Sequence, residues 1–368
     1  MESNVEITVL NKDFDPIGFI ESYESFIWTD RYSEAGDFEL YLPVDLAVLS
    51  LIKQDYYLSC NLSEHVMVIE QIKIETDVEN GNHLAISGRS LESILDRRIV
   101  WGLYTYEENS VNYIMKNLLT KNVISPVVDS RRIDNFVFEE STDERITDIS
   151  INAQFYGDNL FDAIYAICSA YDIGFKIVLT DDKKLVFSLY KGIDRSYNQS
   201  INPYVVFSPD FDNLINSNYL ESRKNMKNAI LIVGEGEGYC RTSTTINLDS
   251  SMGLDRREMF EDAGDISMSV DEDTTLSTDE YKALLVERGL EKLAEHTDIT
   301  AFDGEVESTQ MFKYGEDYFM GDIVQVANEY GHEGASTITE VVITQDENGL
   351  YVYPTFKMRE EEYDEQGN

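Results

Sequence analysis

The order of strand-like and helix-like segments constrains the fold of this chain more than any other feature. Alternating apolar and polar residues, a pattern typical of strands, recur through residues 5–104 and again after residue 300. The longer helical stripes of apolar residues lie between these two regions. No stretch alternates strand and helix for long enough to build a doubly wound parallel sheet. The sequence therefore predicts a β-rich α+β fold.

The longer helical stripes fall in residues 109–122, 158–174 and 277–296. Residues able to cap the first turn of these helices are Asn109 or Ser110, Asp158, and Ser277 or Thr278. Glu280 lies in the first turn of the last helix, where an acid is favourable to the helix dipole. Gly174 is expected to end the second helix in a left-handed conformation.

Local signals also predict one short helix and two tight turns. Residues 89–99 have helical spacing, with Ser90 as the expected N-cap. The Asn80–Gly81 pair is typical of a turn between two strands, because both residue types tolerate positive φ. Residues 346–349 are expected to join the last two strands as a hairpin.

The charge balance is the unusual number in the composition. The chain of 368 residues has 29 basic and 70 acidic residues, a formal net charge of −41. A field of that sign repels phosphate, so the chain is not expected to grip nucleic acid by neutralising its backbone. Anionic membrane surfaces are disfavoured for the same reason.

Three features indicate the compartment in which the chain is expected to fold. Cys60, Cys168 and Cys240 are far apart and form no CxxC motif, which favours free thiols in a reducing compartment. The first ten residues lack a signal-peptide pattern. No apolar run approaches the roughly 18 to 20 residues that a membrane span needs. We expect synthesis in a cytoplasm and no membrane insertion.

Residue types that perform chemistry are present, but they do not converge. The four histidines are scattered, and His65 and His83 on neighbouring expected strands are more often two unrelated strand residues than a shared site. The glycine-rich stretch 234–238 carries Glu235 and Glu237, which would repel a phosphate, and a turn is the better interpretation.

Residues 271–280 resemble a calcium loop in composition only. Leu276 stands where the loop needs glycine, and Lys282 stands where it needs glutamate. An acidic linker leading into a helix cap is the interpretation, with loose calcium binding as the alternative. Neither HExxH nor GxSxG occurs, and so many acids make any carboxylate pair uninformative. We expect no catalytic residue, no cofactor and no metal.

The segment FKYGEDYFMGDIV, residues 312–324, is dense with glycine, aromatic and acidic residues. Gly315 and Gly321 permit positive φ or a close backbone approach. The aromatic residues Tyr314, Tyr318 and Phe319 can cover the end of a small barrel. The segment is therefore interpreted as a connection that β-structure requires, without a ligand.

This segment also resembles a motif near the C-terminus of phage and prophage tail hub proteins. Other stretches are similar to that family in the same order: DRYSEAGDFELYLP (30–43), ISGRSLESILDRRIVWG (86–102), VVFSPDFDNL (205–214) and GLDRREMFEDAGDIS (253–267). Each motif alone is weak, but their shared order over residues 25–345 is much more specific. The family is the siphovirus ReqiPepy tail-protein group, similar in fold to myophage baseplate hubs.

The resemblance implies two small β-barrels of a common tail-protein type with two smaller units. The expected division is a first barrel (1–104), an inserted α+β domain (105–203), a second barrel (204–246 plus 300–360), a small acidic helical insertion (247–299) and a charged tail (361–368). Some relatives carry a C-terminal peptidase or lysozyme. This chain ends soon after its last expected strand, so that activity is expected to be absent.

The resemblance also implies a role and a set of partners. It implies a ring, usually a trimer, at the distal end of a virion tail. The ring joins the tail tube and the distal tail protein to the tip or fibre, and DNA passes through it without specific binding. The residues predicted to contact neighbouring subunits are Arg97, Arg98, Arg256, Arg257, Tyr314, Tyr318 and Phe319.

Two other functions remain as alternatives. A receptor- or carbohydrate-binding tail module would need an aromatic platform, and Trp28 and Trp101 are the only tryptophans. A tail-associated cell-wall hydrolase would need a metal or nucleophile constellation. The same hub would also serve a phage-derived bacteriocin or an injection machine.

The charge balance generates a direct prediction about DNA. At about physiological salt, where screening acts over roughly 8 Å, non-specific affinity of the purified chain for duplex DNA should be negligible. A gel-shift or fluorescence-anisotropy titration checks this, with a basic DNA-binding protein as positive control. Tight binding under those conditions would contradict the expectation that the acidic surface repels phosphate.

Overall fold

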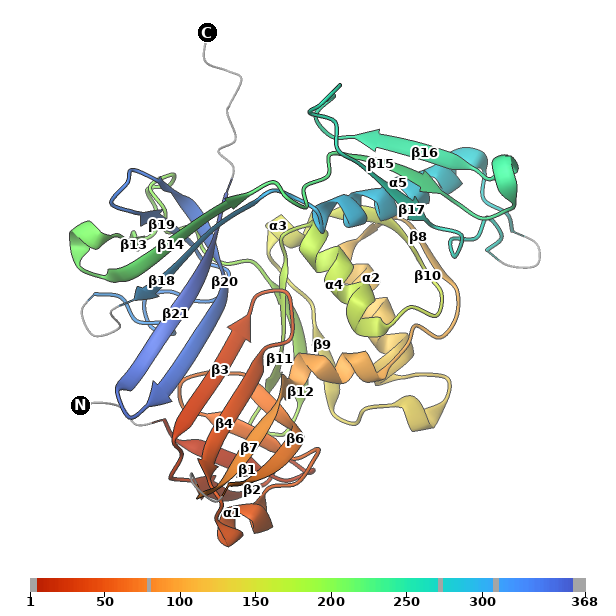
Figure 1. The fold of residues 1–368 in the computed structure, drawn as a ribbon. Helices are drawn as coiled ribbons and strands as arrows, with labels where there is room; N and C mark the ends of the chain where they lie inside the picture. Colours follow the sequence, from red (N-terminus) through yellow and green to blue (C-terminus); the bar gives the residue numbers. More distant parts are fainter. Residues whose placement is uncertain (1–4, 78–80, 271–273, 307–310, 360–368) are drawn as a thin grey trace.

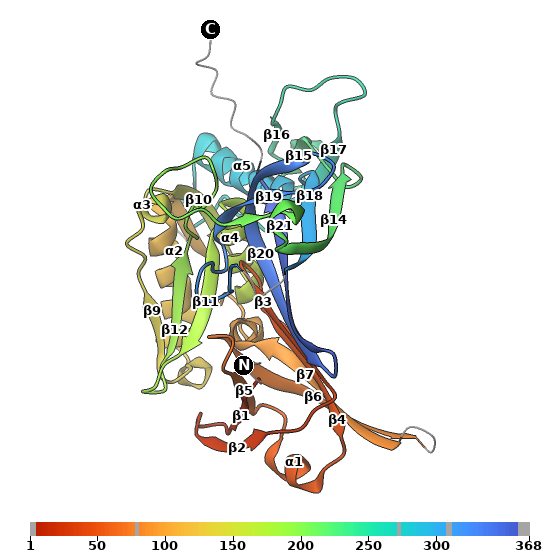
Figure 2. The same cartoon turned by 90° about the vertical axis from the view of Figure 1, so that its left-hand side faces the viewer.

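The computed structural model describes residues 5–77, 81–270, 274–306 and 311–359 (Figure 1). A large, mostly antiparallel sheet lies beside a helix-containing region, and a small strand-and-helix unit packs on that region at the top of both views (Figures 1 and 2). The β-rich α+β fold predicted from the sequence is confirmed. The expected Asn80–Gly81 turn involves a residue outside the described ranges.

Among the described residues, thirteen strands form one sheet, and both ends of the chain contribute to it. Its N-terminal strands are β1 (Ile7–Leu10), β2 (Pro16–Ile20), β3 (Ser25–Arg31), β4 (Asp37–Pro43), β5 (Tyr57–Cys60), β6 (Val66–Asp77) and β7 (Gly81–Ser90). Its C-terminal strands are β13 (Val206–Phe207), β14 (Leu214–Ser222), β18 (Ile299–Val306), β19 (Ile323–Ala327), β20 (Glu333–Asp346) and β21 (Gly349–Met358). The hairpin predicted at residues 346–349 joins β20 to β21.

The two groups of strands meet where β3 pairs antiparallel with β20. The strand order is β14-β18-β21-β20-β3-β4-β7-β6-β5-β1-β2, with β19 also paired to β20 and β13 to β19. This path is open among the described residues, so closure into two barrels is not established. A single apolar core runs along the joint, because Trp28 of β3 and Phe356 of β21 belong to the same buried cluster.

The middle of the chain forms the helix-containing region. Its strands are β8 (Tyr104–Ser110), β9 (Phe136–Glu139), β10 (Ser150–Phe155), β11 (Gly174–Leu179) and β12 (Leu185–Tyr190). Its helices and helical turns are α2 (Val111–Leu119), η2 (Thr120–Ile124), η3 (Asp129–Arg131), α3 (Glu144–Thr147) and α4 (Leu160–Ala170), and it packs on η1 (Leu91–Arg97). Its buried cluster includes Val66 and Val68 of β6, so this region is anchored on the large sheet.

A smaller unit lies between β14 and β18 in the sequence. It consists of a sheet of β15 (Ala229–Val233), β16 (Ser243–Asn247) and β17 (Glu258–Asp262), covered by α5 (Thr278–Ala294). The remaining short elements of the chain are α1 (Leu46–Leu51), η4 (Pro209–Phe211) and η5 (Gly238–Cys240). Figure 1 shows α5 lying between this sheet and α4. The predicted domain boundaries stay a prediction.

The predicted helix ends are confirmed in part. Ser277 and Glu280 form a complete capping box on α5, and Ser110 caps α2. The prediction for Asp158 was wrong, because Asn159 is the residue that accepts hydrogen bonds from the first turn of α4. Ser90 occupies the N-cap position of η1, but its hydroxyl accepts from the Gly36 N–H instead of capping the helix.

Gly174 does not end α4 in a left-handed conformation, as the sequence had predicted. Asp172 does so, with φ of +51°. Gly174 begins β11, and a Cβ there would lie 2.4 Å from the ring of Tyr32. The glycine is therefore required by a close approach between segments and not by the turn.

The contact between α5 and the middle region buries two carboxylates. Glu287 and Glu291 lie on the face of α5 that packs toward α4 and β10, and each is 8% exposed. The Tyr171 hydroxyl donates to Glu287. Burial raises the pKa of Glu291 to about 7, although Arg288 opposes the shift. Burial also raises the pKa of Glu287.

These shifts predict a pH dependence of stability. A carboxyl group whose folded pKa exceeds its unfolded value favours the folded state when protonated, so stability falls as pH rises from about 4.5 to about 7. The Glu291 shift corresponds to a free energy on the order of 3 kcal/mol. The Glu291→Gln variant should therefore lose less stability than the wild type when the pH rises from 5 to 8, because glutamine does not ionise. Thermal unfolding at both pH values measures the difference.

Glu258→Gln on the same unit is a matched control, because Glu258 is exposed at the surface beside Arg256. It should keep the wild-type pH dependence. Equal pH profiles for Glu291→Gln and the wild type would contradict the assignment of a raised pKa to Glu291.

Candidate functional site

The segment 312–322 lies where the two halves of the large sheet and the middle region meet. Tyr318 is 1% exposed and packs edge-on against Phe207, with ring centroids 5.2 Å apart. The Gly315 N–H donates to the Tyr318 carbonyl at 2.9 Å, which closes the turn. Phe319 is 45% exposed. The interpretation as a structural connection therefore agrees with the local geometry.

Gly321 allows three segments to touch. Its φ is +83°, and a Cβ at this position would lie 2.4 Å from the ring of Tyr32, at the end of β3. Gly192, which follows β12, is packed so closely that a Cβ there would lie 2.0 Å from the Gly321 carbonyl group. A glycine is therefore needed on both sides of this contact.

Asp322 fixes the same contact electrostatically. Its side chain is 2% exposed and accepts hydrogen bonds from the Ile193 N–H at 2.6 Å and the Phe319 N–H at 3.1 Å. The Arg195 Nε donates at 2.8 Å to Oδ2, the oxygen that also accepts from the Phe319 N–H. A buried carboxylate satisfied by three donors holds residues 193–195, which follow β12, against the 312–322 segment.

A second buried acid, Asp30, lies on the other side of the segment. Both of its oxygens lie 2.9 Å from the Ser63 hydroxyl, which donates to them, and the Tyr314 hydroxyl donates to Oδ2 at 3.2 Å. Burial raises the pKa of Asp30, and His65 opposes that shift. Burial likewise raises the pKa of the Tyr314 hydroxyl.

His65 and Glu92 form a buried ion pair next to Asp30. The His65 Nδ1 lies 3.3 Å from the Glu92 Oε1, which also accepts from the Ile177 N–H at 2.6 Å. Burial alone would lower the pKa of His65, but Asp30 and Glu92 outweigh it and raise that pKa to about 9. At neutral pH His65 is therefore an imidazolium, whose positive charge faces the Glu92 carboxylate and Asp30.

His65 and His83 each have their own partners. His83 lies 3.3 Å from Glu24 and stacks on Tyr41. Within the described ranges, no group of three or more His, Cys, Asp or Glu residues could hold a metal. Part of the candidate calcium loop, residues 271–273, lies outside these ranges. Stretch 234–238 connects β15 to β16 through η5, as a turn.

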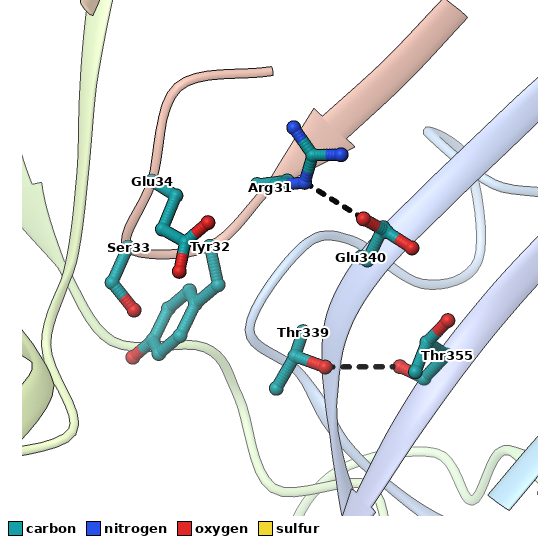
Figure 3. Close-up of a pocket in the computed structure, with 7 residues that line it drawn as sticks. All are labelled: Arg31, Tyr32, Ser33, Glu34, Thr339, Glu340 and Thr355. Carbon is teal, nitrogen blue, oxygen red and sulfur yellow. Dashed lines mark hydrogen bonds and ion pairs between the residues drawn. The ribbon is translucent and has the colours of Figure 1, made fainter. Parts of the chain in front are cut away.

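A cavity of about 240 Å³ opens where β3 pairs with β20 (Figure 3). In Figure 3, Arg31 of β3 points toward Glu340 of β20, and their Nε and Oε2 atoms are 2.7 Å apart. The Thr339 hydroxyl donates to the Thr355 carbonyl at 3.4 Å. Arg31 also pairs with Asp37 at 2.6 Å. The ion pair of Arg31 and Glu340 therefore crosses the joint of the sheet at this cavity.

The residues predicted to contact other subunits lie in three places. Arg97 and Arg98 are at the end of η1, Arg256 and Arg257 precede β17, and Tyr314, Tyr318 and Phe319 are in the 312–322 segment. The structure brings together only the residues that are neighbours in sequence. Tyr318 is buried within the chain itself, whereas the others are at least partly accessible. Their role in assembly stays a prediction.

We call the place where the 312–322 segment meets the two halves of the sheet and the middle region the junction. Sequence reasoning missed four of its residues: Asp30, Glu92, Arg195 and Asp322. One signal could have found Asp30. Phe26, Trp28 and Asp30 alternate along β3 and are all buried, so strand periodicity alone places the carboxylate on the inner face. No local signal identifies the partners of the other residues, because they come from distant parts of the chain.

The whole-chain fold is that of phage and prophage tail proteins. The structure superposes on a tail protein from Neisseria meningitidis MC58 with a TM-score of 0.57 at 11% identity, covering 96% of each chain. It superposes on the 43 kDa tail protein of prophage MuSo2 from Shewanella oneidensis with a TM-score of 0.58 at 12% identity, covering 95% of this chain and 98% of that chain.

A third similar structure is prophage tail protein gp18 from Listeria monocytogenes EGD-e. Its TM-score is 0.53 at 12% identity, with 97% of this chain and 95% of that chain covered. No curated protein is similar enough in sequence to count as a relative. The chain belongs to the family of Siphovirus ReqiPepy6 Gp37-like proteins, whose model matches residues 6–356. The resemblance read from the sequence is confirmed.

The junction generates a prediction from two glycines of one segment. Gly315 and Gly321 have nearly equal φ values, +81° and +83°, but only a Cβ at Gly321 meets other atoms within 4 Å. Gly315→Ala should cost about 1 kcal/mol for the backbone conformation alone. Gly321→Ala should cost at least about 2 kcal/mol more because of overpacking.

Denaturant unfolding of the two variants measures the difference. Both substitutions carry the same conformational penalty, so Gly315→Ala is the control for Gly321→Ala. Equal losses of unfolding free energy in the two variants would show that the contact with Tyr32 does not constrain the fold.

Proposed function

We propose that this protein is a structural subunit of the distal tail or baseplate hub of a phage or prophage tail. The observation that carries the proposal is the extent of the similarity. The family model matches residues 6–356, and three tail proteins share the fold over at least 95% of this chain. In this role the subunit acts in the virion tail after synthesis in the bacterial cytoplasm.

The proposed assembly is a ring, with three copies as the expected number. It joins the tail tube and the distal tail protein to the tail tip or fibre and surrounds the channel through which DNA leaves. In this proposal the N-terminal and C-terminal strands curl into the two small barrels expected of the family. The net charge of −41 supports passage of DNA without adhesion to the wall.

The arrangement of buried polar groups supports a structural role over catalysis. The carboxylates of Asp322 and Glu92 are engaged by donors from other segments of the chain. They therefore stabilise the packing of the chain itself.

Among the described residues, no helix is long and apolar enough to cross a membrane.

Neither alternative function gains a specific observation. Trp28 is fully buried, and the guanidinium of Arg131 lies over the ring of Trp101 at 4.7 Å from its centroid. A sugar would have to displace that cation to stack on the ring. The hydrolase alternative requires a nucleophile and base, or a metal, facing a cleft.

The proposal predicts the mass of the purified protein. Light scattering or native mass spectrometry should detect a closed oligomer of three copies, either alone or after mixing with the distal tail protein encoded beside it. Because a ring forms through matching surfaces, the mass should reach a plateau with concentration and not rise indefinitely.

An unrelated acidic protein of similar size serves as the mixing control. A single-chain mass under every condition, together with no complex with the distal tail protein, would contradict the hub proposal.

A further inference from the structure

A group of cationic and apolar side chains lies at the end of η1 and around η3. We define the basic aromatic surface as Arg98, Ile99, Trp101, Val128 and Arg131. The Arg98 Nε donates to the Arg131 carbonyl at 2.9 Å, and the Arg131 Nη2 donates to the Ile99 carbonyl at 2.6 Å. The Arg131 N–H donates to the Val128 carbonyl at 2.9 Å. These contacts make the surface contiguous.

The arginines of this surface are unusual in so acidic a chain. Among the described residues, Arg98, Arg131 and Arg257 are the arginines with no described carboxylate within ion-pair distance. Arg98 instead donates to two backbone carbonyls. Burial, Arg131 and Arg97 all lower the pKa of Arg98. The positive charge of Arg98 therefore lacks an acid partner within the described chain.

A cleft of about 610 Å³ lies beside Arg98. The other cations that line it have acids nearby: Lys12 and Arg97 both face Asp55, at 4.0 and 3.3 Å, and Lys183 lies 2.5 Å from Asp15. The remaining charges of its lining are Asp13 and Asp134, and Asp134 pairs with Arg132 at 2.9 Å. The apolar side chains of Leu91, Ile94 and Leu185 also line the cleft.

The apolar members of the basic aromatic surface are exposed. Trp101 is 58% exposed, Ile99 is 51% exposed and Val128 is 43% exposed. Arginine and tryptophan are the residues most enriched among those that dominate binding energy in protein interfaces. Accessible apolar groups beside an unpaired guanidinium therefore match the composition of a protein contact.

We propose that the basic aromatic surface is the contact through which one copy of this chain receives an acidic face of a second copy. The existence of an assembly rests on the proposed function. Charge complementarity selects the occupant. The chain has 70 acidic and 29 basic residues, so two acidic faces of different copies repel each other, whereas an acidic face is attracted to the basic aromatic surface. An acidic face that meets a basic one is a head-to-tail contact, and such contacts form a ring when the rotation from copy to copy closes.

Trp101 makes this contact measurable. The chain has two tryptophans, and Trp28 is fully buried, so quenching by neutral acrylamide reports mainly on Trp101. As concentration rises and the assembly forms, acrylamide quenching should fall and the emission should shift to shorter wavelength. The Trp101→Phe variant supplies the signal of Trp28 alone for subtraction.

Arg98→Gln tests the charge. Glutamine keeps an N–H donor for the Arg131 carbonyl, and the dissociation constant of the assembly, measured by light scattering, should rise by at least about tenfold. Arg132→Gln is the matched control, because Arg132 is adjacent but already pairs with Asp134. It should leave the dissociation constant unchanged. Thermal unfolding of both variants verifies that each is folded.

The outcomes separate this inference from the proposed function. An assembly in which Trp101 stays fully quenchable, or which Arg98→Gln leaves unchanged, overturns the inference while the hub proposal stands. A chain that never assembles, alone or with the distal tail protein, overturns both. Trp101 protection that is lost in Arg98→Gln and kept in Arg132→Gln supports the contact.

Discussion

The pairing of β3 with β20 is the interaction on which the rest of this structure depends. It joins strands separated by about three hundred residues and makes one sheet from the two ends of the chain. Backbone hydrogen bonds of the ladder are accompanied by a shared apolar core and by the Arg31 ion pairs at the end of the joint. The middle region and the small unit containing α5 are insertions carried by this sheet.

Closing so long a loop costs conformational entropy, and that cost grows only slowly with loop length. The 312–322 segment adds contacts that form only when the joint is made. Tyr314 binds Asp30, Gly321 packs on Tyr32, and Asp322 binds Arg195. The 312–322 segment thus connects both halves of the sheet to residues 192–195, which follow β12.

The sequence predicts what depends on neighbouring residues. The capping box of Ser277 and Glu280 is a local interaction, and the hairpin at 346–349 needs only its own turn residues. The order of strand-like and helix-like segments also sufficed for the fold class. The sequence predicts Asp158 as the cap of α4, whereas Asn159 is the cap. Both side chains can accept the hydrogen bond, so only the exact first residue of the helix distinguishes them.

What the sequence could not predict depends on residues that are distant in the chain. A glycine is needed at position 174 because the ring of Tyr32 leaves no room for a Cβ. The Ser90 hydroxyl accepts from the Gly36 N–H and does not cap its own helix. The open strand path across β3 and β20 follows from pairing that periodicity does not encode. The same reason hid the junction, because the partners of Asp322 become neighbours only in the folded chain.

Native-state hydrogen exchange tests the central claim most directly, since it resolves the free energy of opening for individual amides. If one sheet unites the two ends of the chain, the paired amides of β3 and β20 should exchange with the same opening free energy and respond equally to denaturant. Protection of β3 that persists while β20 opens independently at much lower free energy would contradict the account.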